Sequence, residues 1–201
     1  MAINFANNSS LANITSLPAS ISGGGLTLVS SQTASASASL EFSMDSTYDS
    51  YVFKFYDIHP ATDSVSFQVN LSIEGGSNYK VTKTTTEFSA YHNEGDTATA
   101  LGYNAVNDLA QSTNDQKLSS SNLGNGNDEA FVGTLHLFNP SSTIFVKHFI
   151  SRVAFYHDSD YAIDGFIAGY GNTTSAIDAI RCHMSSGNID SGVIKLYGIG
   201  G

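Results

Sequence analysis

The feature that most constrains the fold is a nine-residue run of strict alternation, Val65–Ile73. Its odd positions are all apolar and its even positions are all polar. Successive side chains of a β-strand point to opposite faces, so the run predicts a strand with one packed face. The other face is expected to meet water or a partner. The turn residues Gly75-Gly76-Ser77-Asn78 follow directly, as at the end of a hairpin strand.

Strand signals of this kind recur along most of the chain. They predict strands at 26–30, 38–43, 51–56, 65–73, 79–91 (one or two), 132–138, 143–156, 161–170, 176–184 and 192–199. Nine or ten short strands separated by turn residues indicate an all-β protein with a two-sheet β-sandwich or jelly-roll-like architecture.

Residues 92–130 break this pattern. Apolar residues are irregularly spaced between Asp96 and Ala110, where we expect a short helix. Ser119 to Asp128 is rich in Ser, Asn and Gly and predicts a loop. The whole segment is therefore expected to be a long excursion off the sheets, and loops of this length often carry contacts or function.

The first 25 residues form a separate compositional zone that ends in Gly23-Gly24-Gly25. Triple glycine is typical of a linker. We predict a docking arm and linker over 1–25 and a β-sandwich domain over 26–201. The arm is too polar to bury a core of its own, so we expect it to lie against another subunit. The apolar positions expected to make these partner contacts are Ile3, Phe5, Leu11, Ile14 and Leu17.

The charge of the chain limits its partners. The net charge is −10, and the eight Lys and Arg residues form no basic run. Binding to a phosphate backbone is driven by clustered positive charge, so nucleic acid is not an expected partner. No stretch reaches the eighteen apolar residues of a membrane helix, so we expect a soluble protein without membrane insertion. The single cysteine, Cys182, is predicted to be a buried thiol on one face with Ile180 and Met184, with His183 on the other.

No catalytic or cofactor motif appears in the sequence. There is no Gly-x-Ser-x-Gly elbow, phosphate-binding loop or HExxH pattern, so we expect a protein that is not an enzyme and holds no cofactor. Asp45 and Asp49 could form the carboxylate pair of a glycosidase, but a turn is favoured at this position.

Two groups of residues raise the possibility of a metal. Asp158, Asp160 and Asp164 resemble part of a calcium loop, although an acidic turn between two strands is the favoured interpretation. His136 and His148 fall on strands expected to be neighbours, but a zinc or iron site would need a third ligand. We therefore predict no metal site.

Tyrosine and phenylalanine are the remaining candidates for a binding surface, and the chain has ten Tyr, twelve Phe and no Trp. Tyrosine offers rigid amphipathic surface at low entropic cost. Tyr91, Tyr103 and Tyr161 are expected in loops, where they would contact a sugar or another protein. Packing within strands is the alternative.

Four segments together resemble a group of virion proteins from tailed bacteriophages of the marine and cyanobacterial type. They are Ser185–Ile199, which reads SSGNIDSGVIKLYGI, Met44–Tyr51, His136–Pro140 and Gly169–Ile177. The resemblance covers about residues 26 to 201. It implies a protein made in the bacterial cytoplasm and placed on the surface of the particle.

The resemblance implies a tail-fibre or spike component that attaches the particle to its host by binding. A capsid decoration or head-fibre protein is the alternative within this class. A carbohydrate-binding, lectin-like module and a glycan depolymerase are alternatives of other classes. The expected partners are further copies of the chain, most simply in a homotrimer, other virion proteins through the arm, and a host surface glycan.

Overall fold

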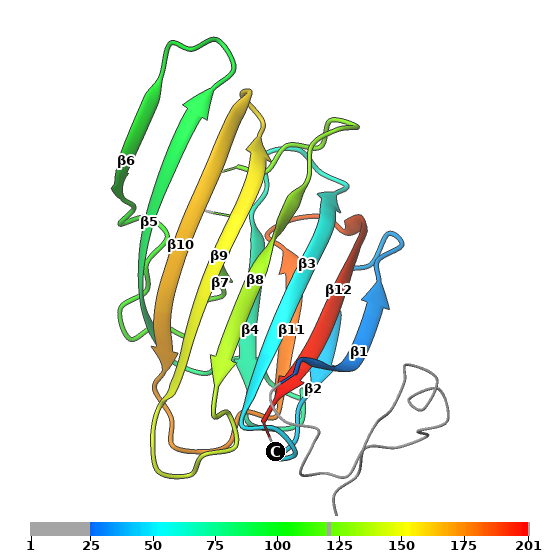
Figure 1. Ribbon diagram of the computed structural model, residues 1–201, viewed down its shortest axis with the longest axis vertical. Helices are drawn as coiled ribbons and strands as arrows, with labels where there is room; N and C mark the ends of the chain where they lie inside the picture. The colour runs from blue at the N-terminus through cyan, green and yellow to red at the C-terminus, as the bar shows by residue number, and fades with distance from the viewer. Residues whose placement is uncertain (1–24, 120–121, 201) are drawn as a thin grey trace, which may run out of the picture.

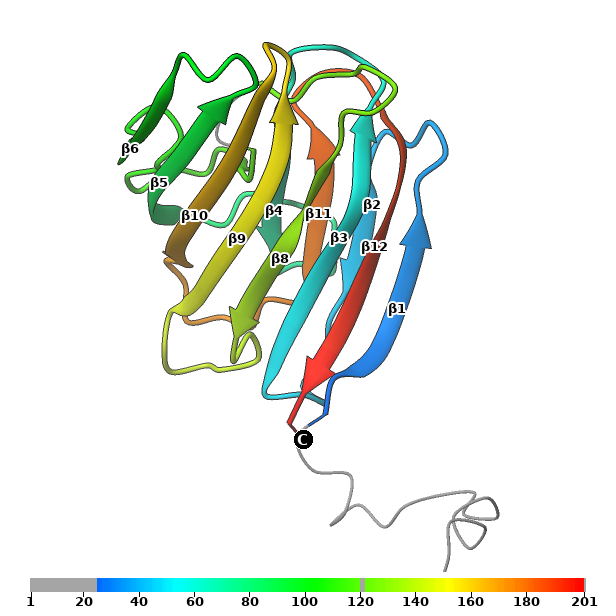
Figure 2. The ribbon, with the colours of Figure 1, turned by 45° about the horizontal axis from the view of Figure 1, so that its top comes forward.

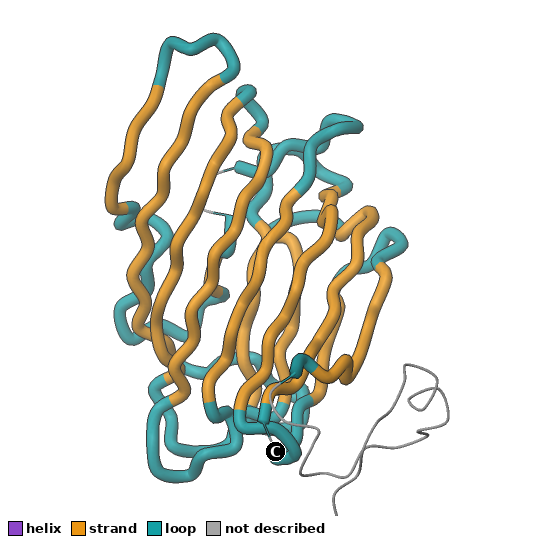
Figure 3. The backbone as a smooth tube through the Cα atoms, viewed as in Figure 1, coloured by secondary structure: helices purple, strands orange, loops and turns teal. Residues whose placement is uncertain are grey.

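The computed structural model describes residues 25–119 and 122–200, which form two antiparallel β-sheets packed face to face (Figure 1). These residues are strands and loops without a helix (Figure 3), so none of them belongs to a helix that could cross a membrane. The all-β sandwich predicted from the sequence is confirmed. The predicted docking arm, with Ile3, Phe5, Leu11, Ile14 and Leu17, lies outside the described residues.

The larger sheet has eight strands in the order β1-β12-β3-β8-β9-β10-β5-β6. Their bounds are β1 Thr27–Thr33, β3 Ser50–Pro60, β5 Lys83–Asn93, β6 Thr99–Tyr103, β8 Phe131–Phe138, β9 Lys147–His157, β10 Tyr161–Gly171 and β12 Ile189–Ile199. The smaller sheet has the order β2-β11-β4-β7, with β2 Leu40–Ser43, β4 Phe67–Ser72, β7 Gln116–Lys117 and β11 Ala179–Met184. The larger sheet extends past the smaller one at β5 and β6 (Figures 1 and 2).

Every segment predicted to contain a strand does contain one. The described residues also form two strands that were not predicted, β6 and β7. The short helix expected within Asp96–Ala110 is wrong, because β6 occupies this segment. The Asn93 side chain explains the difference: its Oδ1 accepts hydrogen bonds from the backbone N–H groups of Thr97 and Ala98 at 2.9 and 2.8 Å. These bonds close a turn that returns the chain along β5, and Gly102 further disfavours a helix.

Four phenylalanine rings join the two sheets. Phe67 of the small sheet packs on Phe55 and Phe131 of the large sheet, with ring centroids 5.3 and 5.0 Å apart. Phe155 extends the cluster, with its centroid 6.2 Å from that of Phe131. All four side chains are buried. Aromatic rings bury more apolar area than other side chains, so this cluster contributes strongly to the contact between the sheets.

Most of the polar face of β4 is shielded from water. Asn70 is only 2% exposed, because the loop between β6 and β7 covers it. Its Nδ2 donates to the Thr113 carbonyl at 3.1 Å and to Asp115 Oδ1 at 2.9 Å. The excursion predicted for residues 92–130 is therefore partly wrong: one part is strand β6, and another part packs on the small sheet.

A buried lysine lies beside this loop. Lys83 Nζ donates to Asn70 Oδ1 at 2.6 Å and to the Val81 carbonyl at 2.8 Å. Burial disfavours the charged ammonium and lowers the pKa of Lys83 to about 8, although the negative charge of Asp115 opposes this effect.

The interpretation of the single cysteine is confirmed. Cys182 is fully buried in the core with Ile180 and Met184, and burial raises the pKa of its thiol. His183 points to the opposite face, where its Nε2 lies 3.4 Å from Asp115 Oδ1. A buried thiol with a raised pKa is a packing group and not a nucleophile.

Three of the segments that carry the phage resemblance, and the C-terminal end of the fourth, Ser185–Ile199, meet at one end of the sandwich, at the bottom of Figure 1. Tyr48 packs its ring against Gly198 so closely that no side chain could replace the glycine hydrogen. The Asn139 N–H donates to the Asp49 carbonyl at 2.8 Å, and the Ile177 N–H donates to the Pro140 carbonyl at 2.9 Å. These segments therefore act together to close this end of the fold.

The aromatic cluster gives a first prediction. Phe67→Ala should lower the free energy of unfolding by about 3–5 kcal/mol, because it removes the ring that joins the sheets and leaves a cavity. Phe145→Ala is the matched control, since Phe145 is 68% exposed in a loop, and it should change stability by less than about 0.5 kcal/mol. Urea denaturation measures both values, and equal losses would contradict the role given to Phe67.

Lys83 gives a prediction about pH. Its pKa is about 8 in the folded protein and 10.5 ordinarily, so between these values the unfolded chain holds more protons. The stability of the wild type relative to Lys83→Met should therefore rise from pH 8 to pH 10.5, by about 3 kcal/mol. Lys80→Met, at an exposed position, should follow the wild type throughout. Urea denaturation at pH 7, 9 and 10.5 tests this, and parallel curves for all three proteins would disprove it.

Candidate functional site

The face of the large sheet that points away from the small sheet, here called the outer face, carries exposed apolar side chains. Alternation along β9 sends Phe149 and Val153 into the core and Ile150 and Arg152 to the outer face. Ile150 is 51% exposed and Phe88 of β5 is 45% exposed. Exposed apolar residues that gather on one face indicate an interaction surface more strongly than scattered ones do.

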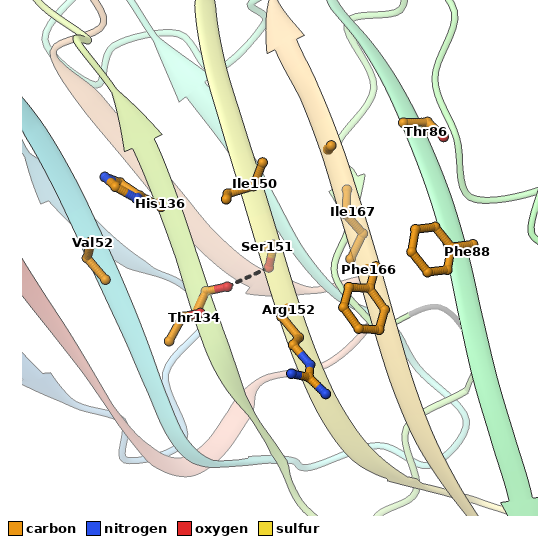
Figure 4. Close-up of a pocket in the computed structure, with 11 residues that line it drawn as sticks. Val52, Thr86, Phe88, Thr134, His136, Ile150, Ser151, Arg152, Phe166 and Ile167 are labelled. Atoms are coloured by element: carbon orange, nitrogen blue, oxygen red, sulfur yellow. Dashed lines mark hydrogen bonds between the residues drawn. The ribbon is translucent and has the colours of Figure 1, made fainter.

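Two adjoining hollows of about 490 and 600 Å³ indent the outer face over β5, β8, β9 and β10. We call the two together the trough. The outer-face residues of the first hollow (Figure 4) are Val52, Thr86, Phe88, Thr134, His136, Ile150, Arg152, Phe166 and Ala168. Those of the second are Ala90, His92, Val132, Arg152, Ala154, Ala162 and Asp164. The several alanines leave the depression open, because their side chains are short.

An aromatic pair and an ion pair lie in the trough. The rings of Phe88 and Phe166 are stacked, with centroids 4.8 Å apart and planes inclined by 5°. Figure 4 shows Arg152 beside these rings, and its guanidinium carbon lies 4.9 Å from the Phe166 centroid. Arg152 also donates two hydrogen bonds to Asp164, from Nε at 3.2 Å and Nη2 at 3.0 Å, which raises the pKa of Arg152. The ion pair and the stack hold each other in place.

The strand register extends this arrangement across the whole sheet. One row of directly opposed residues on the outer face runs through Tyr103, Phe88, Phe166, Arg152, Thr134, Lys54, Lys195 and Ser31. The row is aromatic at the β6 end and cationic toward β12.

The trough contains few ionisable side chains. Asp164 is the one carboxylate among the lining residues, and it is already paired with Arg152. Partial burial lowers the pKa of His136, and its Nε2 lies 3.0 Å from Ser50 Oγ. Acid–base catalysis in a glycosidase uses two facing carboxyl groups, and the lining residues do not supply that pair.

The three tyrosines predicted as loop contacts lie on strands instead. Tyr91 and Tyr161 are on β5 and β10, where their rings meet edge to face at 5.4 Å and line a separate hollow of about 300 Å³ with His157. Tyr103 is on the edge strand β6 and is 58% exposed. Its hydroxyl donates to Asp108 at 2.5 Å, and it lies opposite Phe88 in the register. Tyr103 thus extends the aromatic end of the outer face.

The acidic residues considered for calcium have partners of their own. Asp158 and Asp160 lie in the turn between β9 and β10, whereas Asp164 lies on the outer face. Partial burial tends to raise the pKa of Asp158, but hydrogen bonds from Ser64 and Ser159 lower it overall. Among residues 25–119 and 122–200, no three His, Cys, Asp or Glu side chains are grouped to hold a metal.

The remaining candidates are also placed by the structure. His136 and His148 lie on the neighbouring strands β8 and β9, as predicted, and each packs against an aromatic ring, Phe138 and Tyr170 respectively. Asp45 accepts hydrogen bonds from the Thr47 N–H and the Tyr51 hydroxyl, which lower the pKa of Asp45 and close a turn. Asp49 contributes its backbone carbonyl to the closed end of the sandwich.

Sequence reasoning missed Phe88, Phe166, Ile150 and Arg152. A signal was available in residues 161–170, where both phases of the alternation are apolar: Ile163 and Ile167 in one, Phe166 in the other. Such a strand has two apolar faces, and only one of them is needed for the core.

The chain matches no family model, no curated protein and no solved structure. We therefore infer the function of the outer face from its geometry.

The stacked pair gives a prediction that separates binding from folding. Phe88→Ala and Phe166→Ala should each cost about 1 kcal/mol of stability, well below the cost at Phe67, because both rings lie at the surface. A double-mutant cycle should give a coupling energy of about 0.5–1.5 kcal/mol. Urea denaturation of the two single variants and the double variant measures it. A cost near 4 kcal/mol for either single variant would make the pair a structural element.

Proposed function

We propose that this protein is a non-catalytic binding component of a tailed-phage virion, of tail-fibre or spike type, and that the outer face contacts the host surface. The observation that carries the proposal is the aromatic trough, a preformed apolar depression that the core does not use. Binding sites are typically concave and largely apolar, with a few fixed polar groups. Arg152 and Asp164 supply such groups here.

A host glycan is the partner best suited to this surface. Stacked phenyl rings offer flat apolar area to the C–H face of a sugar ring, and the polar groups around them can bond hydroxyl groups. The surface is open and shallow, so each site is expected to bind weakly. Several copies on one particle would raise the overall strength of attachment by multivalency.

The virion assignment is supported by the resemblance of the four segments. In this proposal the chain is made in the bacterial cytoplasm and assembles as a homotrimer on the particle surface. Residues 1–25 dock on other virion proteins, and the sandwich presents its outer face to the host.

The proposal predicts retention without cleavage. Purified protein should be retained on host cells and on their envelope polysaccharide, and no fragments should be released. Phe88→Ser combined with Phe166→Ser should reduce retention at least tenfold, because the aromatic platform is lost. The matched control is Ile144→Ser with Phe145→Ser, which removes two exposed apolar side chains from a loop outside the trough.

The other outcomes decide between the alternatives. Release of fragments would make the protein a depolymerase. If the protein is not retained on the polysaccharide and releases no fragments from it, a capsid decoration role is favoured. Equal losses in the trough variant and the loop variant would show that the trough is not the contact surface.

A further inference from the structure

We propose that the outer face binds a polysaccharide that carries carboxylate groups, and that Lys54 and Lys195 recognise those carboxylates. This inference rests on the proposed function, because it assigns a ligand class to the same face. The observations that carry it concern where the chain places its few positive charges.

Lys54 of β3 and Lys195 of β12 lie directly opposite each other in the register. Both side chains belong to the outer face and are half-buried. Like charges in directly opposed positions of a sheet are destabilising. The ion pairs formed by the described residues include Arg152 with Asp164 but involve neither of these lysines. The pair is therefore an unfavourable arrangement that an anionic ligand would relieve.

Two tyrosines hold the lysines in position. Lys54 Nζ lies 5.3 Å from the centroid of the Tyr197 ring, and Lys195 Nζ lies 5.3 Å from that of Tyr56. The two contacts cross, so each ammonium packs on a ring of the other strand. A cation over an aromatic face is attracted by the ring, so the two contacts orient both ammonium groups. Preorganised charges bind an anion at a lower entropic cost than mobile ones.

The lysine pair is continuous with the trough. Lys54 lies opposite Thr134, and Thr134 lies opposite Arg152, which lines both hollows. Neighbouring strands are about 4.8 Å apart, so Lys54 and Arg152 are separated by about 10 Å across the sheet. A chain of sugars lying in the trough can therefore direct substituents toward the two lysines while its rings contact Phe88 and Phe166.

The charge of the whole chain narrows the class of ligand. The chain has only eight Lys and Arg residues against eighteen Asp and Glu residues, yet three of the eight lie in this one row. Duplex DNA carries a charge about every 1.7 Å, and the acidic protein would repel so dense a polyanion. A polymer with one carboxylate on some or all of its sugar rings has the wider spacing that the row can match.

The experiment compares three polymers and two charge-matched variants. The polymers are polygalacturonate, its neutral methyl ester and dextran sulfate. The variants are Lys54→Gln with Lys195→Gln, and Lys80→Gln with Lys117→Gln, which removes two positive charges away from the outer face. We expect retention on polygalacturonate that weakens with salt and is much lower on the ester. The Lys54/Lys195 variant should lose about tenfold, and the control variant less than about twofold.

Several results would overturn the inference. Equal retention of the wild type on the acid and on the ester would do so without any variant, as would a preference for dextran sulfate. Equal losses of retention in the two variants would show that binding depends on net charge and not on the positions of Lys54 and Lys195. A change of oligomeric state in the Lys54/Lys195 variant would make the face an interface between copies. Retention on host cells that does not depend on carboxylate groups would contradict the carboxylate inference and leave the proposed function standing. Absence of retention on host cells would contradict the inference and the proposed function together.

Discussion

The sandwich depends on the packing of one small-sheet phenylalanine on two rings of the large sheet. Phe67 packs on Phe55 and Phe131, and Phe155 extends the cluster along β9. This contact fixes which face of the large sheet is the inner one. Because the chain buries that face, Phe88, Phe166 and the rest of the opposite face are left available for other roles.

The larger sheet has eight strands and the smaller sheet four, and a loop packs on the face of the smaller sheet that points away from the larger one. The segment between β6 and β7 covers polar residues of β4, and Asn70 becomes a buried link between Lys83 and Asp115. Hydrogen bonds from His183 and Asn70 lower the pKa of Asp115 to about 2 against the effect of its partial burial. The result is a polar layer behind the small sheet in which Asp115 lies at the centre, bonded to Asn70 and close to Arg181 and His183.

The sequence predicted the strands well, because alternation at Val65–Ile73 and at residues 143–156 reports directly on strand geometry. It did not predict the burial of Asn70, since alternation shows which residues share a face but not what covers that face. It failed at Thr99–Tyr103, where one side chain, Asn93, decides the turn. The trough was out of reach as well, because it exists only once β5, β10, β9 and β8 are placed side by side.

The closed end of the sandwich has a consequence for specificity. The segments that resemble phage proteins interlock there through Tyr48, Gly198, Asn139 and Ile177, and among their residues only His136 lines the trough. The residues that line the trough and those that close this end of the fold are thus largely different sets, although Lys195 of the outer-face row belongs to the segment Ser185–Ile199. Two proteins could share this end and its fold while displaying different outer faces. The scaffold would then tolerate a change of target by substitutions at the trough positions of β5, β9 and β10.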